Sequence, residues 1–499
     1  MRTNPTNLLI LLSDEHTRDV LGCYGNRFVE TPNLDRLAER GTRFGSAYTP
    51  CPICVPARAA IATGRPVHRT GFWDNGMPYD GSVRSWHHEL RDRGHTVSSI
   101  GKLHFDGPES DHGFTEEIDP LHVVDGVGDV LGCIRDDPPP RHKRPGIDEA
   151  GPRDSSYQAY DRRNADHACD WLRAHAADST PWALQVGFVL PHPPYLAPKE
   201  YYDRYRDAPL PMPPEWKHAA WPDHPVLNEF RSFFDFAGPF SEETVRRLVA
   251  AYYGMVSYLD AQIGRVLAEL ERSGLAQRTL VVYTSDHGES FGARGLFGKF
   301  TMYEESAAVP LIVAGPGVPR GTLIESPVSL LDLYPTALDA LGVAAPDRKQ
   351  LIAERPGRSL LETIHRGDAD KAVHDRAVMS EYHAVGSRRG FFMLRDGRHK
   401  YVEYIDAPPQ LFDLTADPEE KHNLAAGTAG ASARPDDRTA LVERLRTRLR
   451  ELVDPEDADR RARADQAAVV DRLGGREAVI ARGAFDNSPV PGEKAEFKR

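Results

Sequence analysis

The sequence has few cysteines, no excess of positive charge and no long apolar run. Only five of its 499 residues are cysteines, an odd number that argues against a disulfide framework. Lysine and arginine total 62 against 74 aspartates and glutamates, so the net charge is −12. This balance argues against nucleic acid or an anionic membrane as a partner, because both bind basic surfaces. A small anionic substrate is compatible with it, since a cationic pocket can form inside an acidic protein.

The apolar run nearest the N-terminus is short. Residues 8–12 read LLILL, and the acids Asp14 and Glu15 follow closely. The run is too short for a signal peptide, which needs roughly 7–15 apolar residues, or for a membrane span, which needs about 18. The sequence therefore predicts a cytoplasmic protein with no membrane partner.

Apolar strands alternate with helical patterns along most of the chain. Strands are predicted at residues 8–12, 97–100, 182–190, 280–283 and 311–314, and helices at 32–40, 56–64, 244–270 and 329–341. This alternation is typical of an α/β fold with a mostly parallel sheet flanked by helices.

The pattern changes after about residue 375. Residues 391–402 predict a hairpin with an Asp-Gly turn, residues 410–414 a further strand, and residues 439–452 a charged helix. We therefore predict a main α/β domain over residues 1–375. A smaller α+β domain with an antiparallel sheet and an extended tail should occupy residues 376–499.

Polar side chains follow several of the predicted strands. They are Asp14 and Glu15, the stretch GKLH at 101–104, His192, and the pair Asp286 and His287. Because ligands bind outside the carboxyl ends of strands in open α/β sheets, these segments should meet at one edge. Carboxylates with an imidazole suit Ca, Mg or Mn as a divalent cation. Each acidic pair alone could equally cap a helix or a turn.

Cys51 and Cys54 have the spacing of a metal or redox motif, but their surroundings argue against both. A zinc knuckle needs a second pair of ligands, which the isolated remaining cysteines do not provide. Pro52 and Pro56 do not suit a redox pair at a helix start. Arg58 is also too close to Cys54 for the anion loop of a cysteine phosphatase. Two buried, inert cysteines remain an alternative.

Residues 54–64, CVPARAAIATG, resemble the signature of type I sulfatases in the alkaline phosphatase superfamily, C-x-P-x-R followed by a T-G pair. The segments TPNLD at 31–35, GKLH at 101–104, SDHGE at 285–289 and LFDL at 411–414 are also similar to that family. The resemblance is strongest to bacterial choline-sulfatase-like enzymes and to phosphonate monoester hydrolases. It implies an alkaline-phosphatase-like fold and places the catalytic site in residues 1–375.

The resemblance also implies roles for individual residues. Cys54 would be oxidised by a formylglycine-generating enzyme to formylglycine (3-oxoalanine), whose hydrate is the nucleophile, with Arg58 orienting it. One divalent metal ion, with Ca favoured over Mn or Mg, would be held by Asp14, Asp286 and His287, with Glu15 as a fourth candidate ligand that departs from the usual aspartate. The remaining candidates bind the sulfuryl group or transfer protons: Asn75, Lys102, His104, His192 and Lys299.

Three functions follow from this resemblance. The first is hydrolysis of small organic sulfate monoesters, and the second is hydrolysis of phosphonate monoesters or phosphodiesters at the same site. The third is a non-catalytic relative that only binds anions. Lys102 and His104 favour sulfate, because the phosphonate hydrolases tend to carry neutral hydroxyl residues there. The tail suggests a homo-oligomer, either a dimer or a tetramer.

Overall fold

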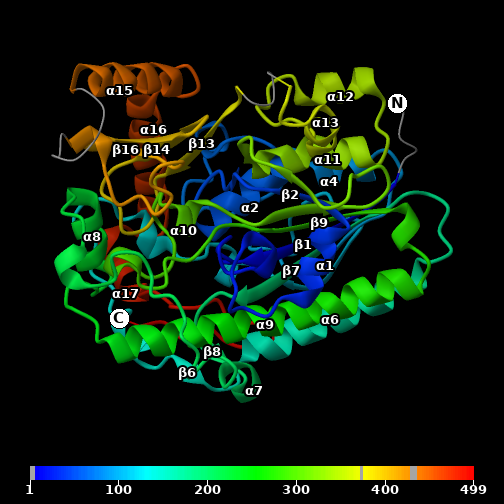
Figure 1. The fold of residues 1–499 in the computed structure, drawn as a ribbon, viewed down its shortest axis with the longest axis horizontal. Coiled ribbons are helices and arrows are strands. Elements are labelled where there is room, and N and C mark those ends of the chain that lie inside the picture. Colours follow the sequence, from blue (N-terminus) through cyan, green and yellow to red (C-terminus); the bar gives the residue numbers. More distant parts are fainter. Residues whose placement is uncertain (1–5, 371–374, 427–434, 499) are drawn as a thin grey trace.

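The computed structural model describes residues 6–370, 375–426 and 435–498. An eight-stranded sheet forms its centre (Figure 1), in the order β11-β2-β10-β9-β1-β7-β4-β5. The strands are β1 (Asn7–Asp14), β2 (Gly41–Phe44), β4 (Val97–Lys102), β5 (Glu116–Leu121), β7 (Ala183–Pro191), β9 (Thr279–Ser285), β10 (Leu311–Ala314) and β11 (Thr322–Ile324).

The strands that carry the polar segments are mutually parallel. β1 pairs in parallel with β7 and β9, and β4 pairs in parallel with β7 and β5. β10 runs antiparallel to both of its neighbours, β9 and β2. The predicted fold class, a mostly parallel sheet flanked by helices, is confirmed. The carboxyl ends of β1, β4, β7 and β9 consequently lie at one edge.

Helices cover both faces of the sheet, and β1 is therefore buried on both sides. Leu9 and Leu11 belong to the core shared with the long helices α6 (Ser156–Ala174) and α9 (Glu242–Arg272). Leu8 and Ile10 belong to the opposite core, with residues of α2 (Cys54–Thr63) and α11 (Leu333–Ala340). Figure 1 shows α6 and α9 side by side beneath the sheet.

A second sheet of four antiparallel strands follows near the C-terminus, as predicted. It contains β13 (Ala377–Tyr382), β14 (Phe391–Asp396), β15 (His399–Tyr404) and β16 (Ala407–Asp413), and α15 (Pro435–Arg450) packs against it. The Asp396-Gly397 turn joins β14 to β15, where the hairpin was expected.

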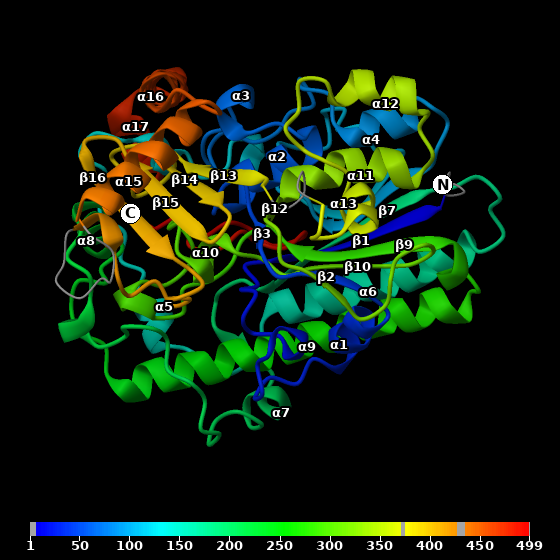
Figure 2. The ribbon, with the colours of Figure 1, turned by 45° about the horizontal axis from the view of Figure 1, so that its top comes forward.

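The segment after residue 454 differs from the extended tail that the sequence suggests. It forms α16 (Pro455–Arg472) and α17 (Arg476–Arg482), which lie against the body of the protein near α3 (Val67–Thr70) (Figure 2). Arg461 on α16 donates a hydrogen bond to the carbonyl of His68 (2.8 Å). Within the described residues, no helix is both long and apolar enough to span a membrane.

A buried acid joins the second sheet to the main domain. Glu381 of β13 accepts hydrogen bonds from the backbone N–H of His68 (3.1 Å) and pairs with the rings of His68 (3.0 Å) and His383 (3.2 Å). Burial alone would raise the pKa of Glu381, but the two histidines hold it well below its ordinary value of 4.5.

Substituting Glu381→Gln should therefore lower the free energy of unfolding by about 3 kcal/mol at neutral pH, the scale of a broken buried pair. Because the folded-state pKa is depressed, this contribution to stability is complete above pH 4.5. It is lost as the pH falls from 4.5 through the lower folded-state pKa. Urea unfolding at several pH values measures the difference. Glu362→Gln, which removes an exposed pair with Arg366, should change stability by less than about 0.5 kcal/mol. A difference between wild type and Glu381→Gln that persists unchanged in acid would contradict the linkage.

Candidate active site

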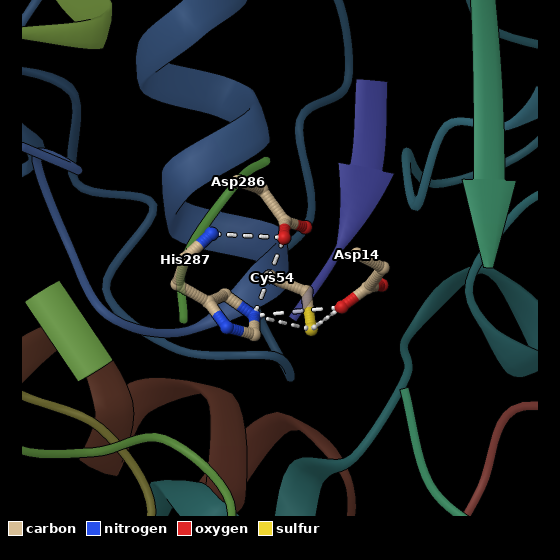
Figure 3. A group of neighbouring side chains, drawn as sticks. All are labelled: Asp14, Cys54, Asp286 and His287. Atoms are coloured by element: carbon tan, nitrogen blue, oxygen red, sulfur yellow. Dashed lines mark hydrogen bonds and ion pairs between the residues drawn. The ribbon is translucent and has the colours of Figure 1, made fainter. Parts of the chain in front are cut away.

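Helix α2 places Cys54 at its first residue, pointing toward the carboxyl ends of β1 and β9 (Figure 3). The sequence predicted a helix start at Pro56, two residues later than observed. Proline fits within the first turn because the N–H groups there have no partner inside the helix. Asn75 accepts a hydrogen bond from the Val55 N–H (3.1 Å) and so satisfies one of these groups. Cys54 is 1% exposed.

The side chains of Asp14, Asp286 and His287 meet around the Cys54 sulfur, so three distant segments contribute to this group (Figure 3). The Sγ atom lies 3.1 Å from His287 Nε2 and 3.6 Å from Asp14 Oδ1. His287 Nε2 lies 3.6 Å from both Asp14 Oδ1 and Asp286 Oδ1. Two carboxylates and an imidazole thus converge, a donor set that fits a hard divalent cation.

Arg58 lies one turn further along α2 and faces the same carboxylates. Its Nε donates to Asp286 Oδ2 (2.7 Å), and another nitrogen donates to the carbonyl of Lys102 (2.8 Å). Arg58 NH2 lies 3.7 Å from Asp14 Oδ2. The guanidinium therefore fixes the positions of both aspartates and of the end of β4.

Two lysines supply further positive charge. Lys102 Nζ pairs with Asp14 Oδ2, and Lys299 Nζ donates to the Cys54 sulfur (3.3 Å) and to Glu15 Oε2 (2.8 Å). Burial would lower the pKa of Lys299, but Cys54, Glu15 and Asp14 hold it well above its ordinary value, so it carries a proton at neutral pH. Burial would also raise the pKa of Asp14, yet Lys102 and other nearby cations hold it well below its ordinary value.

Glu15 lies apart from the group around the sulfur. Its carboxylate contacts Lys299 and lies 3.4 Å from His192 Nε2. Its oxygens group with those of Asp14 and with His192 rather than with Asp286 and His287. The structure therefore places Glu15 beside the other three predicted metal ligands, in contact with the predicted substrate-binding lysine Lys299.

The two predicted proton-transfer histidines are both buried beside the lysines. Burial, followed by the charge of Lys102, holds the pKa of His104 well below its ordinary value, and burial and Lys299 do the same for His192. Both rings are therefore neutral at neutral pH. His104 Nε2 lies 3.0 Å from Ser488 Oγ, and its Nδ1 is buried with no hydrogen-bond partner among the described residues.

Glu15 and His104 are also among the non-glycine residues with a left-handed backbone. Their φ angles are 66° and 57°, in the left-handed region that side chains other than glycine rarely adopt. Such conformations cost of order 1–3 kcal/mol and cluster at functional sites.

A cavity of about 200 Å³ opens beside Lys299. Glu15, His192 and Lys299 line it with the aromatic rings of Phe236, Phe297 and Phe300. Its other wall includes Asp486, Asn487 and Lys498 from the C-terminus. The sequence did not predict these C-terminal residues, nor Ser488 beside His104. Their one visible signal is a short Pro/Gly stretch at residues 488–492, which indicates a turn but not its location.

The fold is of the alkaline-phosphatase-like class, and it places a cysteine at a helix start against carboxylates at the carboxyl ends of parallel strands. The Sulfatase family profile matches residues 6–343, and the profile of the N-sulphoglucosamine sulphohydrolase C-terminal region matches residues 292–452. The chain belongs to the sulfatase family, and it is a sulfuric ester hydrolase.

Individual relatives agree with this assignment. The chain is 32% identical over 449 residues to a choline-sulfatase of Rhizobium meliloti (strain 1021), covering 86% of this chain and 84% of the relative. It is 32% identical over 444 residues to arylsulfatase K of Bos taurus, covering 84% and 78%. A phosphonate monoester hydrolase from Silicibacter pomeroyi is similar in structure, with a TM-score of 0.69, 26% identity and coverage of 89% and 95%. The predicted resemblance to these groups is confirmed.

Proposed function

We propose that this sulfatase hydrolyses small organic sulfate monoesters with a formylglycine formed from Cys54. The observation that carries the proposal is the position of Cys54 at the start of α2, against Asp14, His287 and Lys299 with Arg58 behind it. Burial, followed by the Asp14 carboxylate, raises the pKa of the Cys54 thiol to about 12, which disfavours a thiolate nucleophile. The hydrated aldehyde supplies one hydroxyl that attacks sulfur and a second whose deprotonation expels sulfate.

Asp14, Asp286 and His287 are the proposed ligands of a divalent cation, because their donor atoms converge beside position 54. Carboxylate oxygens favour Ca, with Mn and Mg as alternatives. Glu15 can add a ligand only from the side of Lys299 and His192. The ion supplies Lewis acidity to the nucleophile and to a sulfuryl oxygen.

The lysines are proposed to bind the sulfuryl oxygens and to balance the charge that develops on them. Lys299 donates a hydrogen bond to Cys54 Sγ directly, and Lys102 contacts the same site through its ion pair with Asp14. Fixed cations in a buried site stabilise such charge strongly, because the surroundings do not reorganise during the reaction. Arg58 holds Asp14 and Asp286 in place through the contacts described above.

The proton-transfer roles follow from charge state. Neutral His104 can accept a proton from the nucleophile, whereas Lys299 carries a proton that it can give to the leaving oxygen. His192 lines the cavity and is placed to contact the leaving group. Asn75 is occupied through its Oδ1 atom at the start of α2, which leaves its amide nitrogen for the sulfuryl group.

Hydrolysis of phosphonate monoesters is the second candidate, supported by the structural similarity to the Silicibacter pomeroyi enzyme. Sulfate is preferred because Lys102 and His104 both lie in the site, where they add a charge and a proton acceptor. The cavity of about 200 Å³ lies below the roughly 300–1,000 Å³ typical of ligand pockets, which favours a compact alcohol group.

A panel of three esters tests the proposal: an aryl sulfate, choline sulfate and an aryl phosphonate monoester. Protein co-produced with a formylglycine-generating enzyme should hydrolyse at least one sulfate with a kcat/KM above that for the phosphonate. The same protein made without that enzyme is the matched control, and its activity should follow the fraction of residue 54 converted to aldehyde. A phosphonate turned over far faster than both sulfates would reverse the assignment.

A further inference from the structure

The C-terminal residues form a closed loop against the active site. Ala484 and Lys498 exchange two backbone hydrogen bonds (3.0 and 2.7 Å), which joins the two ends of residues 484–498, here called the C-terminal loop. Lys498 Nζ donates to Asp486 (2.6 Å), and the rings of Phe485 and Phe497 pack edge to face. The loop is therefore a defined unit rather than a free end.

The loop is fastened to the main domain on both sides of the site. The Tyr157 hydroxyl donates to the Ser488 carbonyl (2.6 Å), and Val490 is buried in the core shared with α6 and α9. With its side-chain amide turned so that the nitrogen faces the neighbouring carbonyls, Asn487 donates an N–H to the Pro193 carbonyl (2.9 Å), next to His192. These contacts place Asp486 and Asn487 in the cavity wall.

Ser488 is the residue of this loop that touches the predicted machinery. Its hydroxyl lies 3.0 Å from His104 Nε2, although the two residues are 384 positions apart in sequence. The other ring nitrogen, Nδ1, is buried and has no hydrogen-bond partner in the part of the chain that the structure describes. A serine hydroxyl can both donate and accept, so it can hold the ring in either tautomer while Nδ1 is left for the reaction.

We propose that the C-terminal loop completes the active site within its own chain, and that Ser488 is a positioning residue that orients His104. The loop also limits the size of the alcohol group, because it forms one wall of the small cavity. The role of Ser488 rests on the proposed function of His104, whereas the position of the loop does not.

Kinetics of Ser488 variants test the positioning role. Ser488→Ala should lower kcat for an aryl sulfate roughly 10-fold with little change in KM, the scale seen when a hydrogen-bonded partner of an active-site ligand is removed. Ser488→Thr, which keeps the hydroxyl, should retain most of the activity. Lys494→Ala is the matched control, because Lys494 is exposed on the same loop. An unchanged kcat for Ser488→Ala, or an equal loss in Ser488→Thr, would overturn the role.

Chemical labelling tests the loop without using activity. Diethyl pyrocarbonate modifies accessible neutral imidazoles, and peptide mass analysis measures the rate at His104. A variant lacking residues 484–499 should be labelled at His104 several-fold faster than the full chain, with an unchanged circular dichroism spectrum. Equal labelling rates would show that the loop does not cover the site. If His104 is protected in a full-length chain that has no sulfatase activity, the proposed function is refuted but the position of the loop is not.

Co-production of two variants tests whether the loop acts within its own chain. The truncated chain supplies an intact position 54, and a full-length Cys54→Ala chain supplies only its loop. Activity of the pair should equal that of the truncated chain alone. Recovery toward the full-length activity would show that one subunit donates the loop to another, and would overturn the proposal.

Discussion

Substituting Cys54→Ala should lower kcat/KM for an aryl sulfate by roughly 10⁴-fold or more, the loss expected when a nucleophile is removed. The remaining activity would come from binding and charge stabilisation by Lys102, Lys299 and the proposed metal ion. The KM should change little, because the lysines proposed to contact the sulfuryl group are retained. Initial rates of aryl sulfate hydrolysis by Cys54→Ala and by active wild-type protein measure this loss.

Cys51 provides the matched control, since it is buried in the same C-x-x-C stretch and packs in the core shared with α6 and α9. Cys51→Ala should keep its activity, with a modest loss of stability from the smaller side chain. Mass analysis should find the aldehyde at position 54 and an intact thiol at position 51. Equal losses in the two variants would show that the effect is structural.

Substituting Asp286→Asn should remove both activity and stabilisation by a divalent cation. Losing several kcal/mol of transition-state stabilisation by the metal ion corresponds to a fall in kcat of roughly 10³-fold. The unfolding temperature of wild type should rise on addition of Ca to metal-free protein, whereas that of Asp286→Asn should not change. Differential scanning fluorimetry with and without a chelator measures this without reference to activity.

A second group of possible metal ligands makes this test specific. His112, Glu117 and His122 also bring donor atoms together, but His112 is already hydrogen-bonded to Glu117 and to Asp106 (both 2.8 Å). His122→Ala should therefore keep the Ca-dependent rise in unfolding temperature. If His122→Ala loses that rise and Asp286→Asn keeps it, the cation binds at the wrong place for the proposed function.

Most of the site could be predicted because it follows the carboxyl ends of buried strands. Asp14, Lys102, His192 and Asp286 each end or follow a buried strand, and parallel pairing of β1, β4, β7 and β9 brings them to one edge. The fold class could be predicted for the same reason. The side-chain partners could not be predicted. The Glu15 carboxylate contacts Lys299, whereas its backbone N–H donates to Asp286 (3.2 Å), and no local pattern indicates the left-handed backbone at Glu15.

Elements with a weak apolar pattern were harder to predict. α6 carries a capping box of Ser155 and Gln158, a signal that sequence reasoning did not use. α16 begins at Pro455, directly after the capping residue Asp454, but its charged sequence resembles a solvated tail. The contact of Ser488 with His104 depends on how α16 and α17 return the chain to the main domain, which local patterns do not encode.

The burial of Cys54 has a consequence for the order of events during synthesis. Once His287 has packed against it, position 54 is no longer open to another enzyme, so the proposed oxidation must precede that step. His287 is made 233 residues after Cys54, a delay of roughly 10–50 s at about 5–20 residues per second. The C-terminal loop emerges later still. Rapid early folding would therefore yield a stable, inert protein. The fraction of active enzyme would depend on the rate of Cys54 oxidation relative to the rate at which His287 packs against it.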